Sequence, residues 1–442
     1  MKAQTRTVSA DVFTPIGAYL TLSTPGASCL LESVESGGRI SRYSFLGIDY
    51  LEARTFSGSA NLLQDVRAFM ATHRIALAEA VPGGGALLAF SYDAARSSAR
   101  LSQRESALPA APEAYVAIPS TWLVFDHYSD LLTIWTSGDD DADLEARIDG
   151  YLARLLAAKT ALPSTVATAG EVNASIERAD YLRLVQEVKR HIRDGDVYQL
   201  QLGIRFSAQL RGTAFDVYRS LRSLNPSPYM FFVDAPFGQV FGASPEFLVR
   251  LEGTRARIRP LAGTRSRGAD EAEDVTIAAE LLRNEKERAE HVMLVDLGRN
   301  DLGSVCRYGS VVAEELLQIE RYSHVMHIVS DLTGDLRPDC DALDLFAAGF
   351  PAGTVTGTPK IAAMQIIDRL EPVARGFYAG SIGRWSYGGD FDSCITLRSA
   401  AVRDGTIVWQ ASAGIVADSD PQSEYDEVMH KTRIVREALG VR

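Results

Sequence analysis

The chain has 442 residues, of which 46% are hydrophobic and 23% charged, a composition typical of globular proteins. Its formal net charge of -12 argues against nucleic acid or an anionic membrane surface as the main partner. The sequence shows no run of about 18 apolar residues and no apolar core of a signal peptide, and its four cysteines form no C-x-x-C pair, so we expect a cytoplasmic protein with reduced thiols.

The first 160 residues are predicted to form an N-terminal region of short strands and turns. Strands are expected at TPIGAYLTL (14–22), ASCLLESVE (27–35) and RYSFLGI (42–48), with SGGR (36–39) as a polar turn. Helical patterns follow at 60–73 and 141–158. The stretch 159–176 is rich in Ala, Thr and Ser and is the best candidate for a linker.

From residue 177 onward, helices and alternating strands interleave without a regular βαβ rhythm. A helix at 178–196 leads into an alternating strand at 197–210. Further helices are expected at 214–224, 272–299, 340–349, 359–370 and 421–439, further strands at 229–234, 238–242, 378–387, 392–403 and 406–411, and a strand pair at 246–260. This order predicts an α+β fold with large antiparallel sheets, and residues 177–442 as the catalytic domain.

Two of these helices carry glutamates three residues apart, which places both carboxylates on one helix face. Glu287 and Glu290 lie in the mostly apolar stretch KERAEHVMLVDLGRND (286–301), and Glu424 and Glu427 lie in the last helix. Oxygen ligands of this kind suit a hard divalent cation such as Mg²⁺. The spacing equally fits solvated glutamates or ion pairs with Lys286, Arg288 and Arg433, and spacing alone does not decide between them.

Two glycine-rich segments are candidates for binding anions. FPAGTVTGTPK (350–360) precedes a predicted helix, and ASAGIVADSD (411–420) follows a predicted strand. Backbone N–H groups in such loops attract carboxylate or phosphate, although each loop alone is equally consistent with an ordinary tight turn. Four polar residues stand in apolar surroundings, where a histidine is more often a core residue than a catalyst: Gln199, Glu246, His327 and Arg398.

Taken together, these segments resemble the chorismate-utilising enzymes, and among them the large subunits (component I) of anthranilate synthases. The motifs that carry the resemblance are SRYSFLG, NPSPYMFFVD, GASPEFLVR, LAGTRSRG, ERAEHVMLVDLGRNDLG, YSHVMHIVSDL, FPAGTVTGTPK, RGFYAGSIG and SAGIVADSDPQSEYDE, which occur in family order. The resemblance implies an α/β sandwich of two intertwined subdomains around large, orthogonally packed antiparallel β-sheets, with the active site between them.

The resemblance also implies roles for the candidate residues. Glu290 and Glu427 would bind Mg²⁺ directly, with Glu287 and Glu424 alongside through water, and the metal would hold the ring carboxylate of chorismate. The same carboxylate would contact Thr354, Ala413 and Gly414, and the enolpyruvyl carboxylate would be held by Tyr378 and Arg398. Glu246 would protonate the leaving 4-hydroxyl group, with His327 near that group.

Two positions bear on the nucleophile. Isochorismate and salicylate synthases place a water-activating lysine where Gln199 stands here, and aminodeoxychorismate synthases of the lysine type place their nucleophile at Ala262, beside Gly263 and Thr264 of the LAGT motif. The resemblance therefore implies ammonia as the nucleophile and anthranilate with pyruvate as products. An enzyme that aminates chorismate without losing pyruvate is the alternative, since Ser412 and Thr358 depart from the family pattern. A non-catalytic binding subunit is a third possibility.

The resemblance further implies a partner and a regulator. No cysteine lies in a G-x-C-x-G elbow, so ammonia is expected from a separate glutamine amidotransferase subunit in a hetero-oligomer. A possible tryptophan feedback site comprises Leu31, Glu32, Ser33, Asn225, Pro226, Ser227, Tyr229 and Met230.

Overall fold

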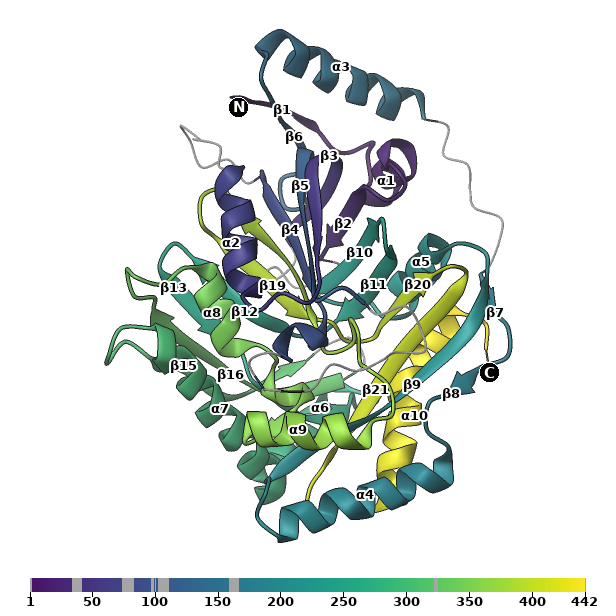
Figure 1. The fold of residues 1–442 in the computed structure, drawn as a ribbon, viewed down its shortest axis with the longest axis vertical. Coiled ribbons are helices and arrows are strands. Elements are labelled where there is room, and N and C mark those ends of the chain that lie inside the picture. Colours follow the sequence, from purple (N-terminus) through teal and green to yellow (C-terminus); the bar gives the residue numbers. More distant parts are fainter. Residues whose placement is uncertain are drawn as a thin grey trace.

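A computed structural model of the chain describes residues 2–33, 42–73, 83–96, 99, 101, 111–158, 167–321 and 325–441. Within these residues strands dominate the centre and helices cover the outside (Figure 1). Every paired strand runs antiparallel to its neighbour, and the pairings branch from one long strand into two arms. None of the described helices combines the length and the apolar character needed to cross a membrane.

The branch point is β5 (Ala114–Asp126), which is almost completely buried. Along one side it pairs with β3 (Tyr43–Phe56), and along the other with β4 (Gly85–Phe90) and β6 (Leu131–Gly138). The strand β1 (Lys2–Ser9) pairs with the outer side of β6, and α3 (Asp141–Ala157) packs against both.

The first arm continues from β3. Its strands, in spatial order, are β2 (Ser28–Glu32), β10 (Tyr229–Ala235), β11 (Gly238–Ser244), β20 (Ser399–Arg403), β21 (Thr406–Ile415) and β9 (Gln199–Arg211). The short strands β7 (Thr168–Ala169), β8 (Asn173–Ala174) and β17 (Gly357–Thr358) add to β9. Apolar side chains alternate along this arm and bury one face against helices, which supplies most of the larger core.

The second arm continues from β4. Its strands, in spatial order, are β18 (Ser381–Ser386), β19 (Phe391–Ile395), β12 (Phe247–Glu252), β13 (Arg255–Ile258) and β16 (Val325–Asp335), and β16 also pairs with β14 (Leu261–Ser266) and β15 (Val312–Arg321). In both arms strands from the first 160 residues hydrogen-bond directly to strands from beyond residue 177. The predicted α+β fold of large antiparallel sheets is confirmed.

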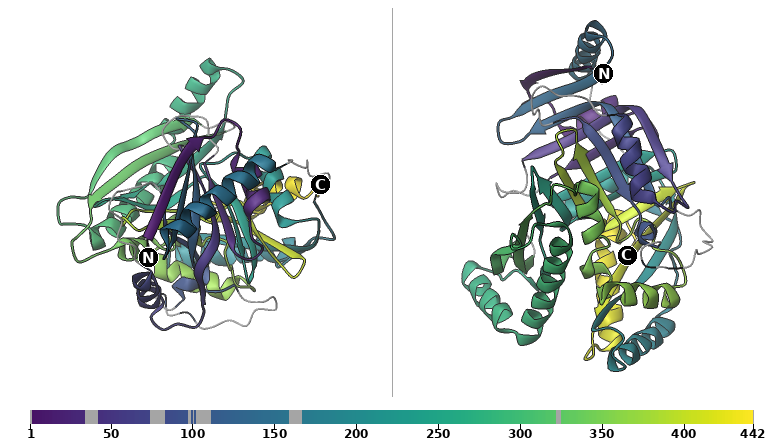
Figure 2. Two further views of the ribbon diagram at one scale, coloured as in Figure 1. Left: turned by 90° about the horizontal axis from the view of Figure 1, so that it is seen from above. Right: turned by 60° about the vertical axis from the view of Figure 1, so that its left-hand side comes forward.

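The helices divide between the arms. Those on the first arm are α4 (Arg178–Arg193), α5 (Ala214–Leu224), α9 (Lys360–Leu370) and α10 (Pro421–Ala438), and those on the second are α6 (Glu271–Arg283), α7 (Glu285–Val305) and α8 (Ala342–Gly349). The remaining two are α1 (Pro15–Leu22) and α2 (Leu62–Thr72). Both glutamate-bearing helices, the green α7 and the yellow α10, stand in the lower half of the molecule in the right-hand view of Figure 2.

The segment TPIGAYLTL, predicted as a strand, is the helix α1. Thr14 adopts an extended conformation and its side chain accepts a hydrogen bond from the N–H of Gly17, while Pro15 occupies the first helical position. Both are start signals of a helix, so the prediction gave too much weight to local β propensity. The predicted turn at 36–39 and residues 159–166 of the predicted linker lie outside the described residues.

Two longer elements are each divided in two. The helix predicted at 272–299 breaks at Asn284. This residue has an extended backbone with ψ near 109°, which ends α6, and its side chain accepts a hydrogen bond from the N–H of Glu287, which caps the start of α7. The strand predicted at 392–403 breaks at Arg398, whose φ of 46° cannot continue a strand. Each break turns the chain beside residues of the candidate site.

Candidate active site

The four predicted metal ligands lie on two helices, α7 and α10, whose carboxylates influence one another electrostatically. Burial raises the pKa of Glu290 on α7, and the charges of Glu287 and of Glu427 on α10 raise it further. Burial and the charge of Glu427 likewise raise the pKa of Glu424, while Lys286 acts in the opposite direction on both residues. The influence of Glu427 on Glu290, which are 137 positions apart in the chain, is consistent with the two helical pairs lying near one another.

Each of three carboxylates is held by a protein donor. Gln199 Nε2 donates to Glu290 Oε1 at 3.1 Å, Arg265 Nη1 to Glu287 Oε1 at 2.9 Å, and Lys431 Nζ lies 2.7 Å from Glu427 Oε1. Among the described residues no three carboxylate, histidine or cysteine side chains approach closely enough to hold a metal ion as they stand. The donor set nevertheless fits a hard cation, which would take over from Arg265 and Lys431 in compensating these charges.

A glycine on the strand beside these carboxylates leaves room for two side-chain amides. Gly414 of β21 pairs with Gln201 of β9, and a Cβ built at position 414 would lie 2.9 Å from the amide nitrogens of both Gln199 and Gln201. Any side chain at 414 would displace the amide that binds Glu290. The glycine therefore lets both side-chain amides pack closely over the backbone of β21.

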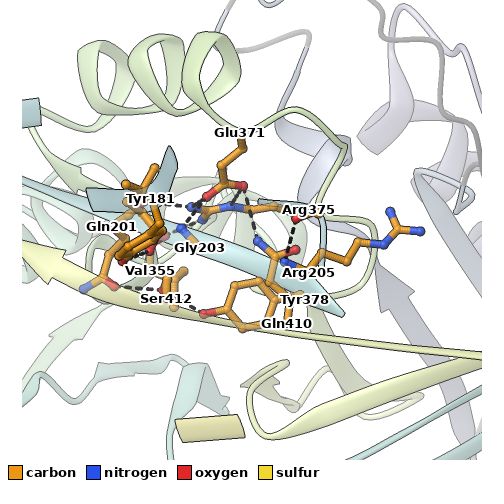
Figure 3. Close-up of polar contacts among 12 residues, drawn as sticks. Tyr181, Gln201, Gly203, Arg205, Val355, Glu371, Arg375, Tyr378, Gln410 and Ser412 are labelled. Carbon is orange, nitrogen blue, oxygen red and sulfur yellow. Dashed lines mark hydrogen bonds and ion pairs between the residues drawn. The ribbon is translucent and has the colours of Figure 1, made fainter. Parts of the chain in front are cut away.

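Ser412, singled out as a departure from the family pattern, belongs to a hydrogen-bond chain on the same face of the sheet. Its hydroxyl donates to Gln201 Oε1 at 2.9 Å and lies 2.7 Å from the hydroxyl of Tyr378 (Figure 3). Lys431 Nζ donates to the Ser412 carbonyl at 2.9 Å. The serine thus links the predicted substrate residue Tyr378 to the amides beside Gly414, and its neighbour Ala413 is fully buried.

A buried ion pair contacts this hydrogen-bond chain through the backbone of Gln201. Arg375 donates to both carboxylate oxygens of Glu371, at 2.7 and 3.0 Å, and to the carbonyls of Val355 and Gln201 (Figure 3). Glu371 also accepts from the N–H of Gly203, and both charged side chains are at most 3% exposed. This ion pair was not predicted from the sequence. Its only local signal is the i,i+4 spacing, which many exposed pairs share.

Arg375→Met is expected to lower the free energy of unfolding by about 3–5 kcal/mol, because it leaves the Glu371 carboxylate buried without its partner. The exposed i,i+4 pair of Arg433 and Glu437 is the matched control, and Arg433→Met is expected to change stability by about 0.5 kcal/mol or less. Urea denaturation followed by circular dichroism measures both. Equal small effects of the two substitutions would contradict the structural role given to Arg375.

Glu246 lies between β11 and β12 with its carboxyl group enclosed by protein. Burial raises the pKa of Glu246 to about 8, and a hydrogen bond donated by Thr354 Oγ1 at 3.3 Å acts in the opposite direction. Both residues line a cavity of about 40 Å³ that Leu297 of α7 closes against Gly353. At neutral pH the carboxyl group is protonated, which is the state a general acid requires.

His327 of β16 faces a bulge in the neighbouring strand. It stands in register with Thr264 of β14, and the ladder shifts at Gly263, whose φ is +65°, between Thr264 and Ala262. Burial lowers the pKa of His327 to about 4, and the charge of Arg398 contributes, so the imidazole is neutral at physiological pH. The LAGT motif, His327 and Arg398 are therefore brought together.

The two segments of the predicted tryptophan site are also adjacent. Strands β2 and β10 pair with Glu32 opposite Met230 and Leu31 opposite Phe231, and Ser33 follows directly. The Glu32 carboxylate accepts from the hydroxyl of Tyr218 at 2.5 Å. The other predicted members, Asn225, Pro226, Ser227 and Tyr229, lie between the end of α5 and the start of β10.

One component of the predicted anion loop is engaged elsewhere. Lys360, the last residue of FPAGTVTGTPK, donates to Asp301 Oδ2 at 3.1 Å. Its charge therefore neutralises a carboxylate of α7, and it does not contribute to an anion site in the glycine-rich loop. Arg265 and Lys431 were not singled out from the sequence, although each compensates a predicted metal ligand. Their positions, inside LAGTRSRG and four residues after Glu427, were the available signals.

Comparisons with known proteins agree with one another. Residues 28–437 match the family model described as chorismate binding enzyme. The chain is 41% identical to anthranilate synthase component 1 of Thermus thermophilus, covering 98% of this chain and 97% of the relative, and 40% identical to that of Acinetobacter calcoaceticus, covering 97% and 93%.

Solved structures give the same result. Anthranilate synthase component I of Streptococcus pneumoniae is similar with a TM-score of 0.83 at 32% identity, covering 97% of this chain and 99% of that one. The menaquinone-specific isochorismate synthase of Escherichia coli has a TM-score of 0.78 at 19% identity, which indicates a shared fold.

Proposed function

Because the chain belongs to the chorismate binding enzyme family, we propose that it is the aminating subunit of an anthranilate synthase. It converts chorismate and ammonia to anthranilate and pyruvate, for tryptophan or related aromatic biosynthesis. The observation that carries this assignment is Gln199, whose neutral amide contacts the carboxylate of Glu290. An amide cannot deprotonate water, whereas ammonia needs no base to act as a nucleophile.

The glutamates of α7 and α10 are the proposed Mg²⁺ site, with Glu290 and Glu427 as direct ligands and Glu287 and Glu424 through water. The mutual repulsion of these carboxylates supports a cation between them. When bound, Mg²⁺ neutralises the ring carboxylate of chorismate and orients the substrate. The backbone of Ala413 and Gly414 and the hydroxyl of Thr354 receive the same carboxylate.

The chemistry needs one acid and one oriented substrate. The protonated Glu246 donates its proton to the leaving 4-hydroxyl oxygen while ammonia adds at C2, which releases water and forms the aminated intermediate. The ammonium group formed at C2 then loses a proton, which restores the acid form of Glu246. Cleavage of the C3–O bond releases the enolpyruvyl group, and the proton lost from C2 balances the one taken up at its methylene carbon, which gives pyruvate and an aromatic ring. Arg398 and Tyr378 hold the enolpyruvyl carboxylate, and the neutral His327 stands beside Arg398 without adding a competing charge.

Ammonia is supplied by a separate glutamine amidotransferase subunit in a hetero-oligomer, and tryptophan is the proposed inhibitor at the β2–β10 pair. Residues 1–160 form the regulatory region and residues 177–442 the catalytic domain. The four free cysteines support a reducing, cytoplasmic location.

Incubation of the purified chain with chorismate, Mg²⁺ and ammonium, in an alkaline buffer that raises the free amine, is expected to yield fluorescent anthranilate and an equal amount of pyruvate. Products are separated by liquid chromatography, and pyruvate is measured by coupling to lactate dehydrogenase. An aminated chorismate without pyruvate would establish the alternative synthase. Chorismate binding without turnover would indicate the non-catalytic reading.

A further inference from the structure

A second and larger pocket lies at the other end of the sheet face that carries the candidate active site. It encloses about 330 Å³, within the range of small-molecule sites. Along β9 and β21, Gln201 and Gly414 mark the active-site end, and Arg205 and Gln410, which pair across the strands, mark the pocket end. None of the glutamates assigned to the metal or to acid catalysis lines this pocket, and Tyr378, whose hydroxyl contacts Ser412, lies between it and the candidate active site.

Arg205 is the cation available to a ligand there. The one hydrogen bond of its side chain to a described residue runs from Nη1 to the Ala374 carbonyl at 3.0 Å, and the guanidinium forms no ion pair with a described residue. The other arginines of the lining each have carboxylate partners: Arg96, Arg375 and Arg403. Burial lowers the pKa of Arg205, an effect that the charge of Asp93 partly offsets.

Gln410 contributes an acceptor that lacks a donor. The side chain is 6% exposed, and its Nε2 donates to Glu371 at 3.3 Å, which fixes the orientation of the amide. Its Oε1 has no hydrogen-bond partner among the described residues. A buried carbonyl oxygen without a partner is costly, and an N–H group of a ligand would satisfy it. Figure 3 shows Gln410 beside Arg205, next to the Glu371–Arg375 pair.

The pocket also has an aromatic wall. Phe237 and Phe377 stack at 5.4 Å between ring centroids, and both line the cavity. The carboxylates of the lining are engaged, since Asp93 binds Arg96 and the N–H of Gly376, Glu113 accepts from the N–H of Ser59, and Asp404 pairs with Arg403. The groups that this pocket offers to a ligand are thus the guanidinium of Arg205, the amide oxygen of Gln410 and an apolar surface on which an aromatic ring can pack.

We propose that this pocket is a binding site for an aromatic carboxylate that carries an amino group. Arg205 receives the carboxylate, Gln410 Oε1 accepts from the amino group, and the ring packs against Phe237 and Phe377. The site differs from the tryptophan site expected at the β2–β10 pair, whose residues do not line it. The proposal does not depend on which reaction the enzyme performs.

Isothermal titration with 2-aminobenzoate tests the site in an Arg398→Gln background, which weakens binding at the proposed substrate site. Arg205→Gln in that background is expected to raise the Kd about 10–100-fold, because it removes a charge-assisted interaction. Benzoate, which lacks the amino group, is expected to bind more weakly than 2-aminobenzoate. Arg211→Gln, in the same strand and outside the pocket, is the matched control and is expected to leave the Kd unchanged.

A second variant keeps the test valid if Arg205→Gln fails to fold. Ala401→Leu narrows the pocket from β20 without touching Arg205 and is also expected to weaken binding. The proposal is wrong if Arg398→Gln alone abolishes 2-aminobenzoate binding, or if the folded pocket variants bind it as tightly as their background does. Equal affinities for benzoate and 2-aminobenzoate would remove the role given to Gln410.

Discussion

Glu290→Gln is expected to lower kcat/KM with ammonium and chorismate about 1,000-fold, and Glu427→Gln to have an effect of the same order. Both substitutions remove a carboxylate from the proposed Mg²⁺ site, and a metal that stabilises developing charge contributes several kcal/mol to the transition state. Steady-state production of anthranilate over a range of Mg²⁺ concentrations measures the loss. Glu437→Gln, on the exposed end of α10, is the matched control and is expected to retain full activity.

A thermal melt separates this role from a structural one. Glu290 is destabilised by burial and by its acidic neighbours, so Glu290→Gln is expected to raise the melting temperature without metal. Added Mg²⁺ is expected to stabilise the wild-type chain but not the variant. Full turnover by both variants in excess EDTA would refute the assignment of these residues as metal ligands.

Glu246→Gln is expected to lower kcat about 10²–10⁴-fold, the usual contribution of a placed general acid. The amide has the shape of the protonated carboxyl group and keeps the Thr354 contact, but it has no proton to give. In the wild-type chain the acid is present below its pKa of about 8, so activity is expected to fall as the pH rises through that value. Rates measured over a range of pH, at saturating chorismate and a fixed concentration of free ammonia, test this fall in activity.

Stability supplies an independent readout of the same group. The folded-state pKa of Glu246 lies above the unfolded value, so the folded protein binds more protons between these values and loses stability as the pH rises from 4.5 to about 8, with no further loss above that. Glu246→Gln removes this loss and is expected to be more stable than wild type above pH 8, with little difference near pH 4. Glu252→Gln, exposed at the end of β12, is the control and should show neither effect. If Glu246→Gln had the rate and pH profile of the wild type, Glu246 would not be the general acid.

Much of the fold could be predicted because its signals are local. Alternation marked β9 and β21, and the spacing of Glu287 with Glu290 and of Glu424 with Glu427 follows from the helical repeat alone. Besides the segment TPIGAYLTL, two errors arose where one residue interrupts an otherwise continuous pattern. Asn284 and Arg398 change the backbone direction without changing the apolar periodicity around them, so the sequence pattern extends through both breaks.

The sequence by itself determined which chemical groups are present and, for neighbours in one helix or strand, which face they share. Only the tertiary structure decided how those groups behave, because contact and burial depend on segments far apart in the chain. Gln199 reaches Glu290 across 91 positions, and Glu246 becomes an acid with a pKa of about 8 because packing around it removes water. Likewise, Arg205 and Gln410 are unremarkable surface-type residues in the sequence, and it is the pairing of β9 with β21 that places them together in one pocket.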